Sequence, residues 1–305
     1  MNSPVIDIHV HFGAPKDEEG GCFWSREFTQ TAAYLAMLLL TKSLFKKIDI
    51  QRVKKHMLGV INGSRFVSKC VLLAMDQVYD ENGHAHPEKT HLFVPNRYLA
   101  KLSSENPRVL LGAAVHPFRN DWSEELDYCP ENKAVLCKWI PSSQVINPSH
   151  QRLLPFYKKL ADHSLPLLCH AGPEYAIPTS PELHNELNNP DFLRTPLDRG
   201  VTVIVAHCAM CADLSVICIP TRSEYVARVL NRVPSRGLLF GSDYPIPLAE
   251  MCYHKWKSPW SRPMFLLKMA VAENLLDKSC HLIKEMGFDE NVFTNAARLF
   301  ESIRY

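Results

Sequence analysis

Short apolar stretches rich in β-branched residues alternate along the chain with longer amphipathic segments, and this pattern predicts repeated strand–helix units. Eight stretches are expected to be strands: 5–10, 69–75, 109–115, 134–140, 165–170, 201–206, 214–219 and 238–240. Helical periodicity predicts helices at 30–44, 96–105, 151–162, 223–233, 263–273 and 295–302. Strands that alternate with helices are typical of a parallel sheet. Eight units predict an α/β fold, a (β/α)8 TIM barrel, whose usual size of about 250 residues fits within the 305 residues of the chain.

The spacing of the expected strands indicates two departures from a regular barrel. Residues 12–68, between the first two strands, exceed what one crossover helix requires. We therefore expect a single barrel domain over residues 1–305, with an insert at about 13–67 that covers the barrel mouth. Only residues 208–213 separate the sixth and seventh strands, whereas a parallel crossover needs about a dozen or more. Either the chain lacks residues here or the barrel is irregular around strands six and seven, which places the neighbourhood of His207 in question.

Composition and charge narrow the class of partner. The chain has 34 Lys and Arg residues against 32 Asp and Glu, a net charge of +2, so no strong field recruits nucleic acid or an anionic membrane. We expect a small-molecule substrate. The longest apolar run, 32–40, is about half of the roughly 20 residues that span a bilayer. We expect a buried or subunit-facing helix there, which allows a homo-oligomer.

The N-terminal sequence and the cysteines bear on the compartment. The first twenty residues lack the basic start, apolar stretch and cleavage site of a secretory signal. The ten cysteines of a chain without such a signal are read as reduced thiols. A cytoplasmic protein is therefore expected. Cys208 and Cys211 form a C-x-x-C motif, but no second pair lies at zinc-ribbon spacing. We therefore interpret them as two small core residues and not as a metal site.

The motif Ile6-Asp7-Ile8-His9-Val10-His11 is the strongest chemical signal. Residues two apart in a strand point to the same face, so His9 and His11 are expected side by side inside the barrel. Two histidines on one strand could also be polar core residues. The recurrence of such residues at other strand ends argues against that interpretation.

Four further polar residues stand where expected strands end, which is where barrel active sites are built. They are Lys138 on the fourth strand, His170 on the fifth, His207 on the sixth and Asp243 after the eighth. Neutral imidazoles and a carboxylate are the ligands of hydrolytic metal sites that keep one position open. We expect a divalent metal, with zinc as the leading candidate and manganese or iron as alternatives. One or two ions fit the pattern.

Lys138 allows two interpretations, because an unpaired charge is costly to bury. Its amine could react with carbon dioxide to form a carbamate that bridges two metals. Otherwise it would stay cationic and bind substrate or Asp243. His116 and Arg119 follow the third strand, where they could contact a substrate carboxylate or simply pack at the surface. No G-x-S-x-G, phosphate-binding loop or dinucleotide fingerprint is present.

This ordered set resembles the amidohydrolase superfamily, and more narrowly the amidohydrolase-related branch that includes decarboxylases and lactonases. The resemblance also includes Gly241-Ser242-Asp243-Tyr244-Pro245 and a closing helix with Asn295-Ala296-Ala297-Arg298-Leu299-Phe300, and it runs from residue 5 to residue 303. It implies that His9, His11, His170 and Asp243 are metal ligands. It also implies that His207 binds metal or polarises the substrate, and that Asp243 is the proton shuttle.

The leading interpretation is a metal-dependent hydrolase of a small amide, cyclic amide or lactone. The metal would activate water and polarise the carbonyl, while Asp243 would take the proton and deliver it to the leaving group. The first alternative is a metal-dependent decarboxylase that protonates the carbon losing carbon dioxide, favoured if His116 and Arg119 bind a carboxylate. The second alternative is a non-catalytic metal-binding barrel that lost its geometry through the missing helix.

Overall fold

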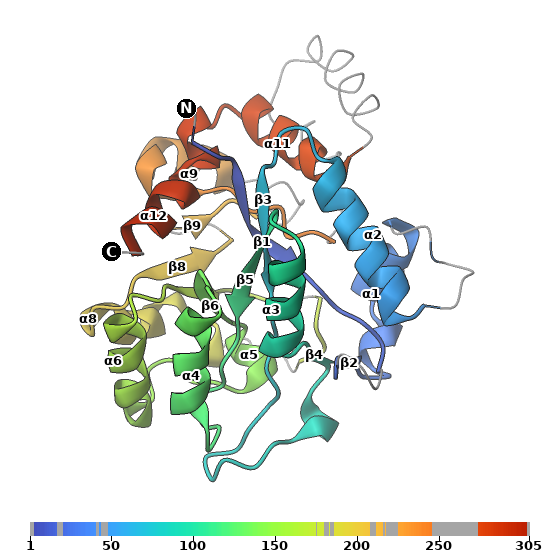
Figure 1. Ribbon diagram of the computed structural model, residues 1–305. Helices are drawn as coiled ribbons and strands as arrows, with labels where there is room; N and C mark the ends of the chain where they lie inside the picture. The colour runs from blue at the N-terminus through green and yellow to red at the C-terminus, as the bar shows by residue number, and fades with distance from the viewer. Residues whose placement is uncertain are drawn as a thin grey trace.

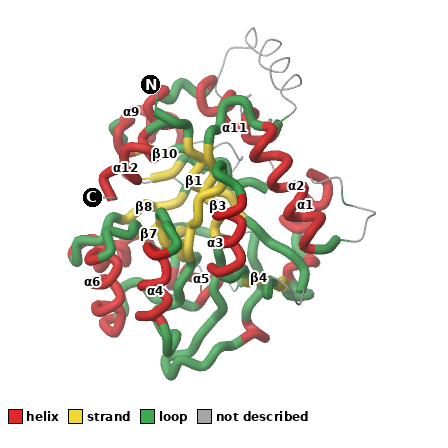
Figure 2. Tube along the Cα trace, in the orientation of Figure 1, coloured by secondary structure: helices red, strands yellow, loops and turns green. Residues whose placement is uncertain are grey.

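In the computed structural model, the chain folds into a barrel of parallel strands with helices around it (Figures 1 and 2). The structure describes residues 3–16, 21–40, 43, 48–174, 176–179, 183, 186–207, 212–215, 217, 225–245 and 274–303. Eight parallel strands follow one another in the sheet in chain order: β1 (Ile6–His11), β3 (Lys69–Leu73), β5 (Val109–Ala113), β6 (Leu136–Trp139), β7 (Leu167–His170), β8 (Val203–Ala206), β9 (Ala212–Asp213) and β10 (Leu238–Leu239). A separate antiparallel pair joins β2 (Phe23–Trp24) to β4 (Leu92–Phe93).

The sheet closes where the segment after β10 meets β1. The Asp243 N–H donates to the carbonyl of His9 over 2.8 Å, and the His11 N–H donates to the carbonyl of Tyr244 over 2.8 Å. Val10 and Tyr244 form a parallel bridge between the same segments. The prediction of a (β/α)8 TIM barrel is confirmed.

Most of the helices pack on the outside of the barrel, whereas α1 (Ala32–Leu40) lies at the mouth and α12 (Asn295–Ile303) at the opposite end. The other described helices are α2 (Ile50–Gly63), α3 (Asn96–Glu105), α4 (Trp122–Glu131), α5 (Pro141–Gln144), α6 (Leu154–Asp162), α8 (Arg194–Asp198), α9 (Val226–Arg232) and α11 (Leu275–Glu285). The bounds of α3 are those predicted. The helix expected at 263–273 lies outside the described residues. Within the described part of the chain, no helix combines the length and apolar character needed to cross a bilayer.

Helix α2 was not recognised from the sequence, although it has a clear physical basis. The side chain of Asp49 caps it by accepting the Arg52 N–H over 2.8 Å. Ile50, Met57 and Ile61 are its buried residues, and their spacing gives the helix one apolar face. α2 lies beside α11 (Figure 1).

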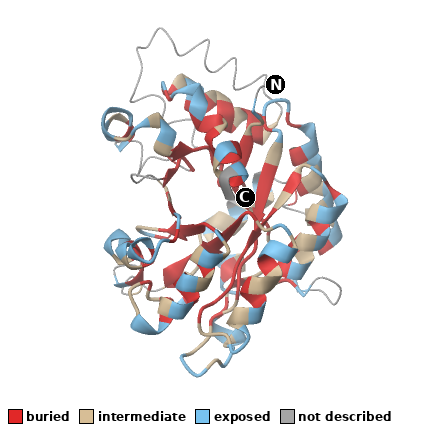
Figure 3. Cartoon of the chain, turned by 60° about the vertical axis from the view of Figure 1, so that its left-hand side comes forward, coloured by how far each residue is buried: buried red, intermediate tan, exposed pale blue. Residues whose placement is uncertain are grey.

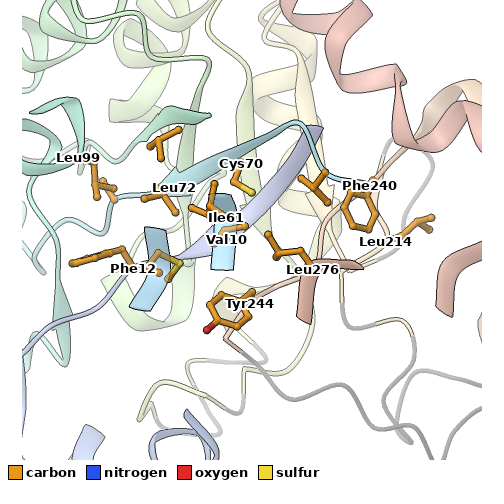
Figure 4. Packing of buried hydrophobic residues seen from close by; sticks show 14 of the residues in the cluster. Val10, Phe12, Ile61, Cys70, Leu72, Leu99, Leu214, Phe240, Tyr244 and Leu276 are labelled. Atoms are coloured by element: carbon orange, nitrogen blue, oxygen red, sulfur yellow. The ribbon is translucent and has the colours of Figure 1, made fainter. Parts of the chain in front are cut away.

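The hydrophobic core has an outer layer between strands and helices and an inner layer within the barrel. The strands are buried, whereas the helices expose their outward faces (Figure 3). In the outer layer, Leu72 of β3 packs among residues that include Ile61 of α2 and Leu99 of α3 (Figure 4). In the inner layer, Ile6 of β1 belongs to the same cluster as Phe300 of α12. Helix α12 therefore covers the end of the barrel opposite the mouth.

The seventh barrel strand begins earlier than the sequence predicted. β9 is Ala212–Asp213, and Ala212 pairs with Val205 of β8. The expected strand at 214–219 is wrong, since Leu214 already lies beyond the strand and Ser215 lies in a turn. The strand ends here because the Asp213 carboxylate accepts the Ser215 N–H over 3.1 Å, as in a side-chain-capped turn.

The connection from β8 to β9 is irregular, as the sequence predicted. It consists of residues 207–211, which are too few for a crossover helix. Residues 208–211, which contain the Cys208–Cys211 motif, lie outside the described residues. The connection from β9 to β10 keeps a helix, α9.

Candidate metal centre

An irregularity in β1 aims both of its histidines at the barrel mouth. The register between β1 and β3 shifts between Asp7 and Val10, which is the mark of a β-bulge. Within the bulge, the His9 N–H donates to the Asp7 carboxylate over 3.1 Å. The side chain of His9 is fully buried, and that of His11 is 19% exposed. The pair therefore presents one enclosed and one accessible imidazole.

His9, His11 and Asp243 converge on one point at the carboxyl ends of the strands. The Nε2 atoms of His9 and His11 are 3.0 Å apart. The Oδ1 atom of Asp243 lies 3.1 Å from Nε2 of His11 and 3.3 Å from Nε2 of His9. One ligand atom from each residue lies within 4.8 Å of the others. This is the arrangement that a metal ion held by three side chains requires.

A buried carboxylate, Asp213, fixes the tautomer of His9. Nδ1 of His9 lies 2.5 Å from Oδ2 of Asp213, and both side chains are fully buried. Burial raises the pKa of Asp213, but His9 and the hydrogen bonds to the carboxylate outweigh burial and hold it well below its usual range. Because the ionised carboxylate can only accept, the proton of His9 lies on Nδ1 and Nε2 carries a lone pair.

The donor atoms of His9, His11 and Asp243 decide whether a cation fits among these residues. With Nε2 of His9 and Oδ1 of Asp243 as acceptors, the proton on Nε2 of His11 lies between them. A metal ion in place of that proton would face two imidazole lone pairs and one carboxylate oxygen. This donor set suits zinc and also iron or manganese, so the residues present fit a divalent metal.

His170 and His207 form a second pair beside the first. Nε2 of His207 lies 3.1 Å from Nδ1 of His170, and Nδ1 of His207 lies 2.8 Å from Oγ of Ser215. The Ser215 hydroxyl donates to Asp213 through a short hydrogen bond, so it accepts the Nδ1–H of His207. Glu174 lies 3.4 Å from Nδ1 of His170. His207 therefore presents Nε2 as a lone-pair nitrogen, as His9 does.

Lys138 is fully buried at the end of β6. Among the described residues, its Nζ has no hydrogen-bond partner, and this includes Asp243. Burial lowers the pKa of Lys138, although the charges of Asp213 and Asp243 oppose the change. A lysine with a lowered pKa holds more of the neutral, nucleophilic amine. This property suits the carbamate interpretation.

His11, His170, His207 and Asp243 open into a cavity of about 130 Å³. Its polar lining consists of His11, His170, Glu174, His207 and Asp243. The apolar lining includes Phe12, Leu92, Ile140 and Ile177. Five residues of the insert between β1 and β3 also line the cavity, namely Gly13, Trp24, Phe28, Ala33 and Met37. The insert thus contributes one wall of the barrel mouth.

The structure does not bring His116 and Arg119 to this cavity. His116 is buried, and its Nε2 donates to the carbonyl of Gln144 over 2.9 Å. Arg119 makes ion pairs with Asp76 at 3.1 Å and with Asp121 at 2.8 Å. Neither residue is among the described residues that line the cavity.

Asp213 is the residue that sequence reasoning missed. The expected seventh strand began at Leu214, which placed Asp213 in a connection rather than at a strand end. The signal was present, because an acidic residue follows a short apolar stretch here as Asp243 does after β10.

Comparisons with known proteins agree on the fold. A family model described as "Amidohydrolase" matches residues 6–261. No curated protein matches the chain. An uncharacterized TIM-barrel protein from Bordetella bronchiseptica is 14% identical, with a TM-score of 0.57, over 97% of this chain and 100% of its own.

Two further solved structures carry names that indicate reactions. A protein assigned as a 2-pyrone-4,6-dicarboxylic acid hydrolase from Pseudomonas putida is 10% identical, with a TM-score of 0.54, over 100% of both chains. A 5-carboxyvanillate decarboxylase from Sphingomonas paucimobilis is 11% identical, with a TM-score of 0.53, over 98% of this chain and 99% of its own. At these identities, the likeness shows a shared fold.

Proposed function

Because this chain belongs to the amidohydrolase family, whose members are metal-dependent hydrolases and decarboxylases, we propose that it is a metal-dependent hydrolase of a small amide, cyclic amide or lactone. The convergence of His9, His11 and Asp243 beside a cavity carries this proposal. The apolar walls of that cavity suit a small substrate with one polar, reacting end.

In the proposed site, His9, His11 and Asp243 hold the metal, and His170 and His207 complete it from the neighbouring strands. Zinc is the leading candidate, with manganese and iron as alternatives. When bound, the metal supplies a Lewis acid that polarises a carbonyl and makes water a better nucleophile. Asp213 keeps the lone pair of His9 directed at the site through their 2.5 Å contact.

Asp243 is the proposed proton carrier, and His207 is the proposed second catalytic group. Burial raises the pKa of Asp243, but His9, His11 and Lys138 outweigh burial and lower it below its usual range. The carboxylate is therefore ionised at neutral pH and can accept a proton at one of its oxygens. His207, which lines the cavity, would orient the substrate carbonyl.

Lys138 has two proposed states. As a carbamate, it would add anionic oxygens at the centre of the site and could hold a second ion. As an ammonium, it would neutralise the carboxylates of Asp213 and Asp243 and attract an anionic substrate. The complete burial of its Nζ without a hydrogen-bond partner among the described residues supports a role at the centre rather than at the surface.

The proposal is tested by metal content and turnover together. His9→Ala/His11→Ala should lose stoichiometric metal, measured by elemental analysis, and should lose hydrolysis of a panel of lactones and cyclic amides. His84→Ala/His86→Ala is the matched control, because these two histidines also stand two positions apart, on an exposed loop. Unchanged metal in the first variant would refute the ligand assignment.

A decarboxylase is the second candidate. In it, the charges of Asp213 and Asp243, which oppose the effect of burial, would keep Lys138 cationic for a substrate carboxylate. One structural neighbour is named a 5-carboxyvanillate decarboxylase. Release of carbon dioxide from aromatic acids by the metal-loaded protein, without hydrolysis of the panel, would favour this candidate. Stoichiometric metal without either reaction would favour a non-catalytic barrel.

A further inference from the structure

We propose that Arg52, together with His56 and Tyr244, forms a carboxylate-binding subsite beside the metal centre, so that the substrate carries an acid group away from its reacting carbonyl. This inference rests on the proposed function, because it names the substrate class of the same site. Arg52 and His56 lie in α2, a helix that was not recognised from the sequence.

The subsite is a second cavity that adjoins the first. Its volume is about 30 Å³. A cavity needs about 10–15 Å³ to hold one water, so this one has room for about two waters or for a small polar group of similar size. The two cavities share lining residues, namely His11, Gly13, Met37 and Pro245. The two cavities are therefore adjacent, and we infer that a single small molecule extends from one into the other.

Helix α2 presents Arg52 and His56 on one face. They are four positions apart, a spacing that places side chains next to each other on a helix, and both line the cavity. Nε2 of His56 and the hydroxyl of Tyr244 are 2.8 Å apart. Since Tyr244 directly follows Asp243, this contact links the subsite to the metal centre through one peptide unit.

The helix that carries the subsite is held firmly. The Asp49 side chain caps its first turn, and Met57 and Ile61 are buried beneath it. At its other end, the Asn274 side chain donates to the carbonyl of Val60 over 2.7 Å. The backbone from which the Arg52 side chain extends is therefore held in place before a ligand arrives.

Charge at the subsite favours an anion. No Asp or Glu is among the described residues that line it. No described residue forms an ion pair or hydrogen bond with the Arg52 guanidinium, whereas the guanidinium of Arg97 pairs with Glu125 and that of Arg119 with Asp76. A guanidinium matches the two oxygens of a carboxylate through parallel N–H bonds. An acid group is therefore the ligand that this cavity fits best.

The test compares two ligands that differ in one group. Isophthalate has two carboxylates, and 3-carbamoylbenzoate replaces one of them with an amide of similar shape. Calorimetric titration of the zinc-loaded wild type should show isophthalate binding about tenfold or more tighter, since hydrogen bonds to charged groups are the stronger ones. In Arg52→Gln this preference should fall to within about twofold. Arg52→Lys should keep part of it, because the charge remains.

The matched control is Lys55→Gln, which removes a positive charge from an exposed position of the same helix. It should keep the preference of the wild type. Equal preference in the wild type and Arg52→Gln would overturn the inference. So would an equal loss in Lys55→Gln, because a general field would then explain the preference.

The outcome for the subsite can be distinguished from the outcome for the proposed function. If the wild type binds zinc and hydrolyses the panel while Arg52→Gln keeps the preference for isophthalate, only the subsite is refuted. If Arg52→Gln abolishes the preference while the wild type turns over no substrate, the subsite stands and the proposed reaction is refuted.

Discussion

Asp213→Asn tests whether a fully buried carboxylate sets the metal affinity of the centre. In the wild type, Oδ2 of Asp213 accepts Nδ1–H of His9 over 2.5 Å. Its Oδ1 accepts the backbone N–H groups of His207 and Ser215, each over 3.1 Å. An asparagine would turn one of these two acceptors into an NH2 donor.

Both orientations of the asparagine amide are unfavourable. With NH2 toward His9, Nδ1 would have to accept, the proton would move to Nε2, and the lone pair needed for a metal would be lost. With NH2 toward His207 and Ser215, two N–H groups would face a donor. Loss of such a partner of a metal ligand reduces affinity by about 10- to 100-fold, which is about 1.4–2.8 kcal/mol.

The assay is a zinc titration of metal-free protein in competition with a chromophoric chelator. Asp277→Asn is the control, because Asp277 is also a buried carboxylate that accepts two backbone N–H groups and a serine hydroxyl. These partners belong to residues 64–66, which are not among the residues of the proposed centre. Both variants should unfold at lower temperature, and only Asp213→Asn should lose zinc affinity. A zinc affinity of Asp213→Asn within threefold of the wild type would refute the reasoning.

Three further changes have defined outcomes. Asp243→Asn should keep metal, by elemental analysis, but lose about 10²- to 10⁴-fold in kcat, because the amide cannot accept a proton; a kcat within threefold of the wild type excludes Asp243 as the proton carrier. Lys138→Met should raise the melting temperature of the metal-free protein, since burial lowers the pKa of Lys138 and so the charge opposes folding; a lower melting temperature would contradict this. Burial lowers the pKa of His116 from 6.5 to about 4. Between these two pH values, His116 is therefore protonated in the unfolded chain but not in the folded one. This difference contributes up to about 3 kcal/mol to the free energy of unfolding above pH 6.5. Urea titrations of the wild type should show that the contribution is lost as the pH falls from 6.5 to 4. Titrations of His116→Gln should not show this loss.

The barrel and the centre of its site follow from local patterns in the sequence. His9 and His11 could be placed together because alternation in a strand depends only on neighbouring residues. Asp243 could be placed near them because the carboxyl ends of parallel strands meet at one edge of the barrel. The bulge between Asp7 and Val10 could not be foreseen, since it depends on pairing with β3.

The remaining features depend on contacts between distant segments. Arg119 stands next to a strand end, as a substrate-binding residue would, yet Asp76 from another strand end holds its guanidinium. Arg52 lies in a segment whose helix is stabilised by burial against α11, so the local sequence did not single it out. Asp213 was missed through an error of two residues in a strand boundary, which is enough to move a side chain from a site into a loop.

The closure of the barrel determines when the metal centre can form during synthesis. His9 and His11 leave the ribosome early, but Asp243 and the backbone bonds that hold it beside β1 come from the last barrel strand. A nascent chain that ends before β10 has two of these three proposed ligand residues and no closed sheet to orient them. If the proposed centre binds metal, high-affinity binding would therefore report that the two edges of the sheet have joined. A zinc-dependent signal from stalled chains of increasing length would show when this happens.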